Sequence, residues 1–185
     1  RVEKKCGLLN QIGFAGTFHS FSLNLLRQYS SEYMFLRRAS SFPQVIDDEF
    51  KNRIMKNIIM ADPSRFLGMP HDAVLSIAEN IERLDSYMTK KLKRSPVYYE
   101  LIKVYEEYRN YKIRENYIDY EDMINETATL LEKNTSVQSD VHNRFNYIFV
   151  DEFQDTSENN MKLIQLLMPH NRKNLFMVGD DYQSI

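Results

Sequence analysis

Two acidic side chains stand directly behind an apolar run in the sequence. Asp151 and Glu152 follow residues 147–150, Tyr-Ile-Phe-Val, without any spacer. Adjacent carboxylates repel each other unless a cation or a proton relieves the repulsion, so a hard metal ion such as Mg²⁺ is a suitable partner. The alternative for an isolated Asp-Glu pair is a solvated acidic turn, because charged residues mostly lie in water.

A second acidic pair favours the chemical interpretation. Asp180 and Asp181 follow the apolar residues 175–178, and Gln183 comes two residues later. If both pairs lie at the ends of neighbouring strands, they converge on one crevice. Such a crevice suits metal-assisted phosphoryl transfer. An Asp would hold Mg²⁺, a neighbouring Glu would orient or deprotonate the attacking water, and the amide of Gln183 would contact a terminal phosphate.

The surrounding pattern predicts the elements that position these groups. Residues 147–150 are β-branched or aromatic and show no polar alternation, which is typical of a strand buried on both faces of a parallel sheet. A helix over about 158–168, stopped by Pro169, and a second strand in 175–178 complete a βαβ unit. In open α/β sheets, ligands bind at the carboxyl ends of the strands, where the acidic pairs fall.

The rest of the chain favours helices. A short strand ending near Thr17 precedes a helix, and residues 45–133 have an almost wholly helical pattern in which Asp119 can cap a helix. Residues 134–140 are expected to be a polar connector. The layout predicts one sheet domain interrupted by a helical insertion.

Bulk composition is that of an ordinary soluble globular protein of 185 residues, with 43% hydrophobic and 27% charged residues. A net charge of -2 argues against a protein that binds nucleic acid through the electrostatic field of the whole chain, although it is compatible with a local basic groove. One cysteine suits a reducing, cytoplasmic setting, and there is no apolar run of membrane-spanning length. Because the first residue is Arg1 and Ile185 follows a Gly-Asp-Asp turn, both ends are expected to be cuts through a longer chain.

Four stretches of the sequence together resemble the UvrD/Rep family of superfamily 1 ATP-dependent DNA helicases. In chain order they are GTFHSF at 16–21, YIDYEDMI at 117–124, VDEFQDTS at 150–157 and FMVGDDYQSI at 176–185. The resemblance implies a partial RecA-like P-loop NTPase parallel sheet, an α/β fold, interrupted by a mainly helical inserted subdomain. Residues 1–35 and 116–185 would belong to the RecA-like domain, and residues 36–115 would form the insertion.

The resemblance also implies roles for the acidic groups. Asp151 would be the Walker B residue that helps to hold Mg²⁺, usually through water, and Glu152 would be the catalytic base. Gln183 would sense the γ-phosphate of ATP, and Asp180 would belong to the same nucleotide-binding set. Tyr182 stands where many members of the family carry a third Asp, which we interpret as a tolerated variation.

Thr17, Phe18, His19 and Ser20 match the family's single-strand contact motif. Hydroxyls and backbone N–H groups at a helix start suit phosphate, and Phe18 and His19 could meet a base or sugar. Two alternatives stay open from the residues alone: Thr17 as a simple helix N-cap and His19 as a structural histidine. The motif around residues 119–122 is expected to be mostly structural.

The family's phosphate-binding loop, which ends in Gly-Lys-Thr, is not found in this sequence, because none of its five glycines is followed by lysine. The second RecA-like domain is also outside it. The resemblance therefore implies a parent helicase that uses ATP and Mg²⁺ to move on single-stranded DNA and to unwind duplex DNA, while this chain alone is inactive. A non-catalytic nucleic-acid-binding or interaction module and the helicase part of a helicase-nuclease are the alternatives.

Overall fold

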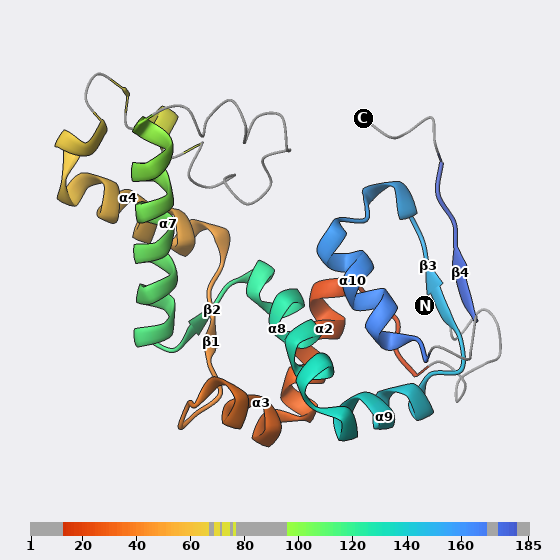
Figure 1. Cartoon of the computed structure of the whole chain (residues 1–185). Coiled ribbons are helices and arrows are strands. Elements are labelled where there is room, and N and C mark those ends of the chain that lie inside the picture. The colour runs from red at the N-terminus through yellow and green to blue at the C-terminus, as the bar shows by residue number, and fades with distance from the viewer. Residues whose placement is uncertain are drawn as a thin grey trace. The chain divides into compact units, whose positions relative to one another are not determined.

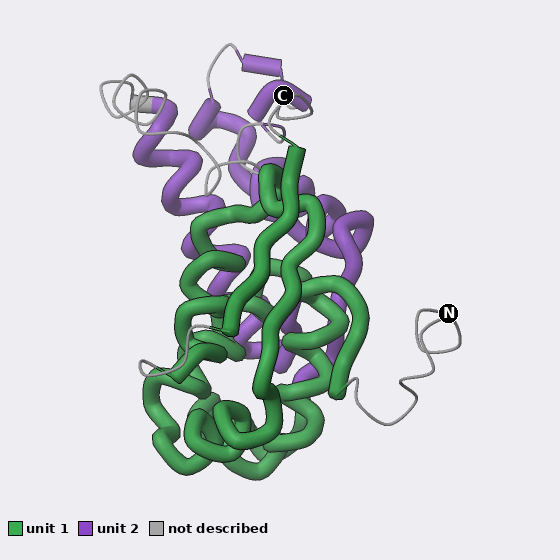
Figure 2. Tube along the Cα trace, turned by 90° about the vertical axis from the view of Figure 1, so that its right-hand side faces the viewer, with its two compact units in different colours: residues 1–42, 120–185 green, residues 43–119 purple. Residues whose placement is uncertain are grey.

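The computed structural model describes residues 13–66, 69–70, 72–74, 76, 96–169 and 174–180. These residues are mostly helical and contain two parallel two-stranded sheets (Figure 1). The chain divides into two compact units, residues 1–42 with 120–185 (unit 1) and residues 43–119 (unit 2), as Figure 2 shows. Unit 1 is therefore built from two stretches of sequence, whereas unit 2 is continuous.

Helices α2, α9 and α10 of unit 1 begin where the sequence provides a capping side chain. The side chains of Thr17, Asn134 and Ser157 accept hydrogen bonds from the backbone N–H groups of Ser20, Val137 and Asn160, respectively. The elements of this unit are α2 (Phe18–Gln28), α3 (Ser30–Arg37), α8 (Tyr120–Lys133), α9 (Thr135–Arg144), β3 (Ile148–Val150), η2 (Phe153–Asp155), α10 (Glu158–Leu167) and β4 (Leu175–Met177).

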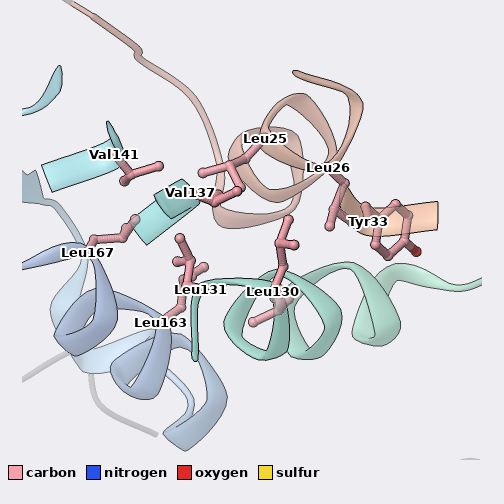
Figure 3. Close-up of a cluster of buried hydrophobic side chains, with 10 residues drawn as sticks. Leu25, Leu26, Tyr33, Leu130, Leu131, Val137, Val141, Leu163 and Leu167 are labelled. Carbon is pink, nitrogen blue, oxygen red and sulfur yellow. The ribbon is translucent and has the colours of Figure 1, made fainter. Parts of the chain in front are cut away.

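The core of unit 1 forms around α8, which packs against both α2 and α10. Leucines on the three helices meet with two valines from α9 and with Tyr33 from α3 (Figure 3). Residues 25 and 26 on α2 and residues 130 and 131 on α8 are adjacent pairs, which widen each apolar stripe. The buried side chains are Leu25, Leu26, Tyr33, Ile124, Leu130, Leu131, Val137, Val141, Leu163 and Leu167.

The expectation of a polar connector at 134–140 is wrong, because α9 occupies this stretch. Asn134 caps the helix, and Val137 and Val141 are 3% and 1% exposed. These two valines lie one helical turn apart and are enough to anchor the helix on the core. The polar remainder of the segment faces solvent, which gave the sequence the composition of a loop.

Strands β3 and β4 pair in parallel, as the βαβ pattern predicts, with Ile148 opposite Leu175 and Val150 opposite Met177. The expectation that the first strand is buried on both faces is wrong, however. Val150 is 6% exposed, whereas Phe149 is 75% exposed and its ring stacks on that of Phe176 at a centroid distance of 5.1 Å. Successive side chains of a strand point to opposite faces, and in the described residues the helical core covers only the face carrying Ile148 and Val150.

Unit 2 combines helices with a pair of very short parallel strands that the sequence pattern did not predict. Its elements are β1 (Gln44–Val45), α4 (Asp48–Ala61), η1 (Pro63–Phe66), α7 (Pro96–Arg114) and β2 (Tyr117–Ile118). Helices α4 and α7 pack together through Ile54, Met55, Ile59, Leu101, Val104 and Tyr108. Much of the helical pattern between α4 and α7 lies outside the described residues.

A buried ion pair ties the end of α7 to the end of β2. Lys112 Nζ and Asp119 Oδ2 are 2.7 Å apart, and the hydroxyl of Tyr108 donates to the same oxygen at 2.7 Å. Lys112 and Asp119 are only 5% and 3% exposed, and the ammonium also lies 4.6 Å from the ring centroid of Tyr108. Asp119 therefore contributes to the packing of unit 2, while a mostly structural role for the whole motif stays a prediction.

A buried tyrosine in unit 1 predicts an alkaline loss of stability. Tyr33 donates its hydroxyl proton to Glu126, whose Oε2 also accepts from Arg37 at 2.7 Å. Burial, followed by the nearby Glu126 carboxylate, raises the pKa of Tyr33 well above its ordinary value of 10.0. The resulting stabilisation is complete below pH 10 and is lost as the pH rises from there toward the folded-state pKa, because the unfolded chain releases the proton first.

We expect the free energy of unfolding of unit 1 to fall above pH 10 by up to about 1.4 kcal/mol per pH unit from this group. Tyr33→Phe should flatten that slope, measured by urea unfolding between pH 9 and 11.5. Tyr147→Phe, at a side chain that is 59% exposed, is the matched control and should leave the slope of the unfolding free energy against pH unchanged. Equal slopes in the Tyr33→Phe variant and the unsubstituted protein would contradict the assignment.

Candidate nucleotide and nucleic-acid site

Asp151 and Glu152 lie directly beyond the carboxyl end of β3, and both side chains are exposed. Glu152 has φ 51°, the left-handed conformation, which turns the chain from the strand into η2. Asp151 Oδ1 accepts the N–H of Glu152 at 3.0 Å and so supports this turn. A non-glycine residue in this conformation is energetically costly, and such positions concentrate at functional sites.

The ends of β3 and β4 are joined beyond the last paired residues. The N–H of Val178 donates to the carbonyl of Val150, and the N–H of Phe153 donates to the carbonyl of Val178, both at 2.9 Å. Asp180 follows and donates its backbone N–H to Gln154 Oε1 at 2.9 Å. The structure therefore brings Asp180 to the same sheet edge as Asp151 and Glu152.

Gln154 bridges the two acidic segments. Its Nε2 donates to Glu152 Oε2 at 2.7 Å, while its Oε1 accepts from Asp180. Sequence reasoning did not single out this residue, although its position inside the VDEFQDTS stretch was a usable signal. Asp181 and Gln183 lie outside the described residues, so the structure does not place them.

No group of three or more His, Cys, Asp or Glu side chains within the described ranges is arranged to hold a metal ion. A site for Mg²⁺ at this edge would use one or two carboxylates. This matches the usual behaviour of Mg²⁺, which keeps several waters and binds substrate phosphates in addition to a few protein oxygens.

The second group of predicted residues lies at the start of α2. Thr17 caps the helix through the N–H of Ser20 at 3.2 Å, and Ser20 Oγ donates to the carbonyl of Thr17 at 2.9 Å. Thr17, His19 and Ser20 are exposed, whereas Phe18 is partly buried against the core of unit 1. The polar members of the motif therefore face solvent at a helix N-terminus, where backbone N–H groups favour anions.

Tyr120 is a neighbour of this motif that sequence reasoning did not assign to it. Its ring meets that of His19 edge to face at a centroid distance of 5.7 Å, and it is 41% exposed. Both residues belong to stretches quoted for the resemblance, and the structure brings these stretches together. Their exposed rings form a small aromatic surface beside the helix start.

A comparison with known families decides the classification. The family model for the UvrD/REP helicase N-terminal domain matches residues 1–185, the whole chain. The chain belongs to the UvrD/REP helicase family. The residues predicted for the site therefore lie in a chain that matches the UvrD/REP helicase N-terminal domain over its whole length.

Three curated relatives are named as DNA helicases or as a probable homolog of one. The chain is 28% identical over 169 residues to the ATP-dependent DNA helicase Rep of Buchnera aphidicola subsp. Baizongia pistaciae, covering 91% of this chain and 24% of that protein. It is 30% identical over 177 residues to a probable DNA helicase II homolog of Mycoplasma genitalium, covering 91% and 24%. It is 28% identical over 189 residues to the helicase PcrA of Staphylococcus aureus strain COL, covering 100% and 25%.

The chain thus spans about a quarter of the length of these curated relatives. Among its described helices, none combines the length and the apolar character needed to cross a membrane.

Proposed function

We propose that this chain is part of an ATP-dependent DNA helicase that couples ATP hydrolysis to movement on single-stranded DNA and to duplex unwinding. Membership of the UvrD/REP family supports the class of activity. The observation that carries the proposal is the convergence of Asp151, Glu152 and Asp180 at one edge of the parallel pair β3–β4. That edge is where α/β sheets bind ligands.

At this edge each carboxylate has a distinct proposed task. Asp151 holds Mg²⁺, mainly through water, and its exposed hard oxygen donors fit that ion. Bound Mg²⁺ would neutralise charge on the ATP phosphates. Glu152 orients the attacking water and accepts its proton, while Asp180 and Gln183 contact the nucleotide and its metal shell.

Single-stranded DNA is proposed to bind at the start of α2. The hydroxyls of Thr17 and Ser20 and the backbone N–H groups at the start of the helix would contact phosphate. His19 would contact a base or sugar, with Phe18 supporting it from its partly buried position. Aromatic faces are sequence-tolerant stacking partners for bases, so exposed Tyr120 extends this surface.

The two structural units are proposed to correspond to the parts of the family's first motor domain. Unit 1, with the β3–β4 pair, would be part of the RecA-like domain, and unit 2 would be the inserted helical subdomain. The phosphate-binding loop and the second RecA-like domain would belong to a longer protein, since this sequence has no Gly-Lys-Thr. The 185-residue chain by itself is therefore proposed to be inactive.

Single-stranded-DNA-stimulated ATPase activity of the longer protein tests this function. We expect turnover that requires Mg²⁺, rises on addition of an oligonucleotide and is absent from the 185-residue chain assayed in parallel. Chelation of Mg²⁺ serves as the matched negative control. DNA binding without any turnover by the longer protein would contradict the proposal and favour a non-catalytic module.

A further inference from the structure

Both the oxygen and the nitrogen of the Gln154 side-chain amide form hydrogen bonds, and these two bonds fix the orientation of the amide. A backbone N–H can only donate, so the oxygen of the amide must face Asp180, at 2.9 Å. The nitrogen then faces Glu152 Oε2 at 2.7 Å, where a carboxylate can only accept. The two partners lie in different segments of the chain, and each of them is compatible with only this orientation of the amide.

Space for this amide depends on Gly179. A Cβ at position 179 would lie 2.7 Å from Gln154 Oε1, 3.2 Å from the backbone nitrogen of Gln154 and 3.3 Å from Phe153 Cβ. The first distance is shorter than real Cβ atoms adopt, and the other two neighbours are held by the backbone bond from Phe153 to Val178. A larger residue at 179 would therefore displace the amide from its place.

We propose that Gln154 is a positioning residue that fastens the carboxylate of Glu152 to the end of β4. The inference rests on the proposed function, because it gives Gln154 its role through the catalytic base. Glu152 is exposed and itself adopts the left-handed conformation, so its side chain needs a partner to hold one rotamer. Gln154 supplies that partner from two residues away and is itself anchored by the backbone N–H of Asp180, in the segment that follows β4.

Substitution of Gln154 by methionine or glutamate distinguishes the effect of its hydrogen bonds from the effect of its side-chain volume. Gln154→Met keeps the length and volume but loses both hydrogen bonds, whereas Gln154→Glu keeps an acceptor for Asp180 and cannot donate to Glu152 when ionised. In the longer protein we expect each to lower kcat of the DNA-stimulated ATPase on the order of tenfold, with KM for ATP changed by less than about twofold. Gly179→Ala should lower kcat in the same direction. Gln165→Met, at an exposed position on α10, is the matched control and should leave kcat unchanged.

A double-mutant cycle with Glu152→Gln distinguishes positioning from general damage. If Gln154 acts through Glu152, Gln154→Met should add little further loss in the Glu152→Gln background, measured by single turnover. The inference would be overturned if the rate losses of Gln154→Met and Glu152→Gln multiplied in the double variant. An unchanged kcat in the Gln154→Met, Gln154→Glu and Gly179→Ala variants would also overturn it. Those outcomes leave the ATPase of the unsubstituted protein intact, whereas absence of stimulated turnover in that protein would overturn the proposed function and this inference together.

Discussion

Glu152→Gln in the longer protein is expected to reduce single-stranded-DNA-stimulated ATP hydrolysis by about 100-fold or more, the contribution of a positioned general base. The substitution keeps the shape of the side chain and leaves an oxygen that can accept from Gln154 Nε2, the contact made at 2.7 Å. It removes the ability to take a proton from water. Because Asp151 is unchanged, binding of Mg²⁺-ATP should stay within a few-fold of the original.

Steady-state turnover at saturating ATP and oligonucleotide, together with binding of a fluorescent ATP analogue, measures both parts of this expectation. Glu158→Gln is the matched control, because Glu158 is an exposed glutamate at the start of α10. It should change turnover by less than twofold. A Glu152→Gln variant that retained most of its turnover would show that another group activates the water.

Asp119→Ala is expected to produce the largest loss of stability, about 3–5 kcal/mol in unit 2. The substitution leaves the ammonium of Lys112, which is 5% exposed, without the carboxylate that lies 2.7 Å from it. It also removes the acceptor of the buried Tyr108 hydroxyl. A buried charge that loses a carboxylate partner is costly, because the interior solvates it poorly.

Amide hydrogen exchange in α7 and β2 reports this loss locally, without requiring that the whole chain unfold in one step. Glu115→Ala is the matched control, since the Glu115–Arg114 pair is exposed and such pairs contribute at most about 1 kcal/mol. The double substitution Lys112→Met with Asp119→Leu should recover much of the protection, because it replaces the ion pair by apolar side chains. Unchanged exchange in Asp119→Ala would contradict a buried, closed pair.

Local signals were sufficient for helices α2 and α10 and for the acidic sheet edge. Thr17 and Ser157 each stand just before an apolar stripe, and α2 and α10 begin there. The parallel pairing of β3 with β4 followed from the βαβ period. Burial of Phe149 could not be predicted, because burial depends on what covers a face and not on the residue itself.

Other features depend on contacts between distant positions. β1 and β2 have two residues each, too few to show a period, and they exist because Gln44 pairs with Tyr117. Gln154 meets Asp180 across 26 positions, and only the register of β3 against β4 brings them together. The carboxylates of the site were therefore singled out from the sequence, whereas Gln154, which contacts one of them, was not.

The two-part construction of unit 1 has a consequence for its synthesis on the ribosome. The hydroxyl of Thr127 in α8 reaches the carbonyl of Ser22 in α2 across 105 positions. At about 5–20 residues per second, α2 emerges roughly 5–20 s before the helix that covers it. During that interval Leu25 and Leu26 have no native partner from α8, whereas unit 2 is translated as one continuous stretch. Chaperones are therefore expected to bind the nascent α2. Slower translation should lengthen the time for which they stay bound.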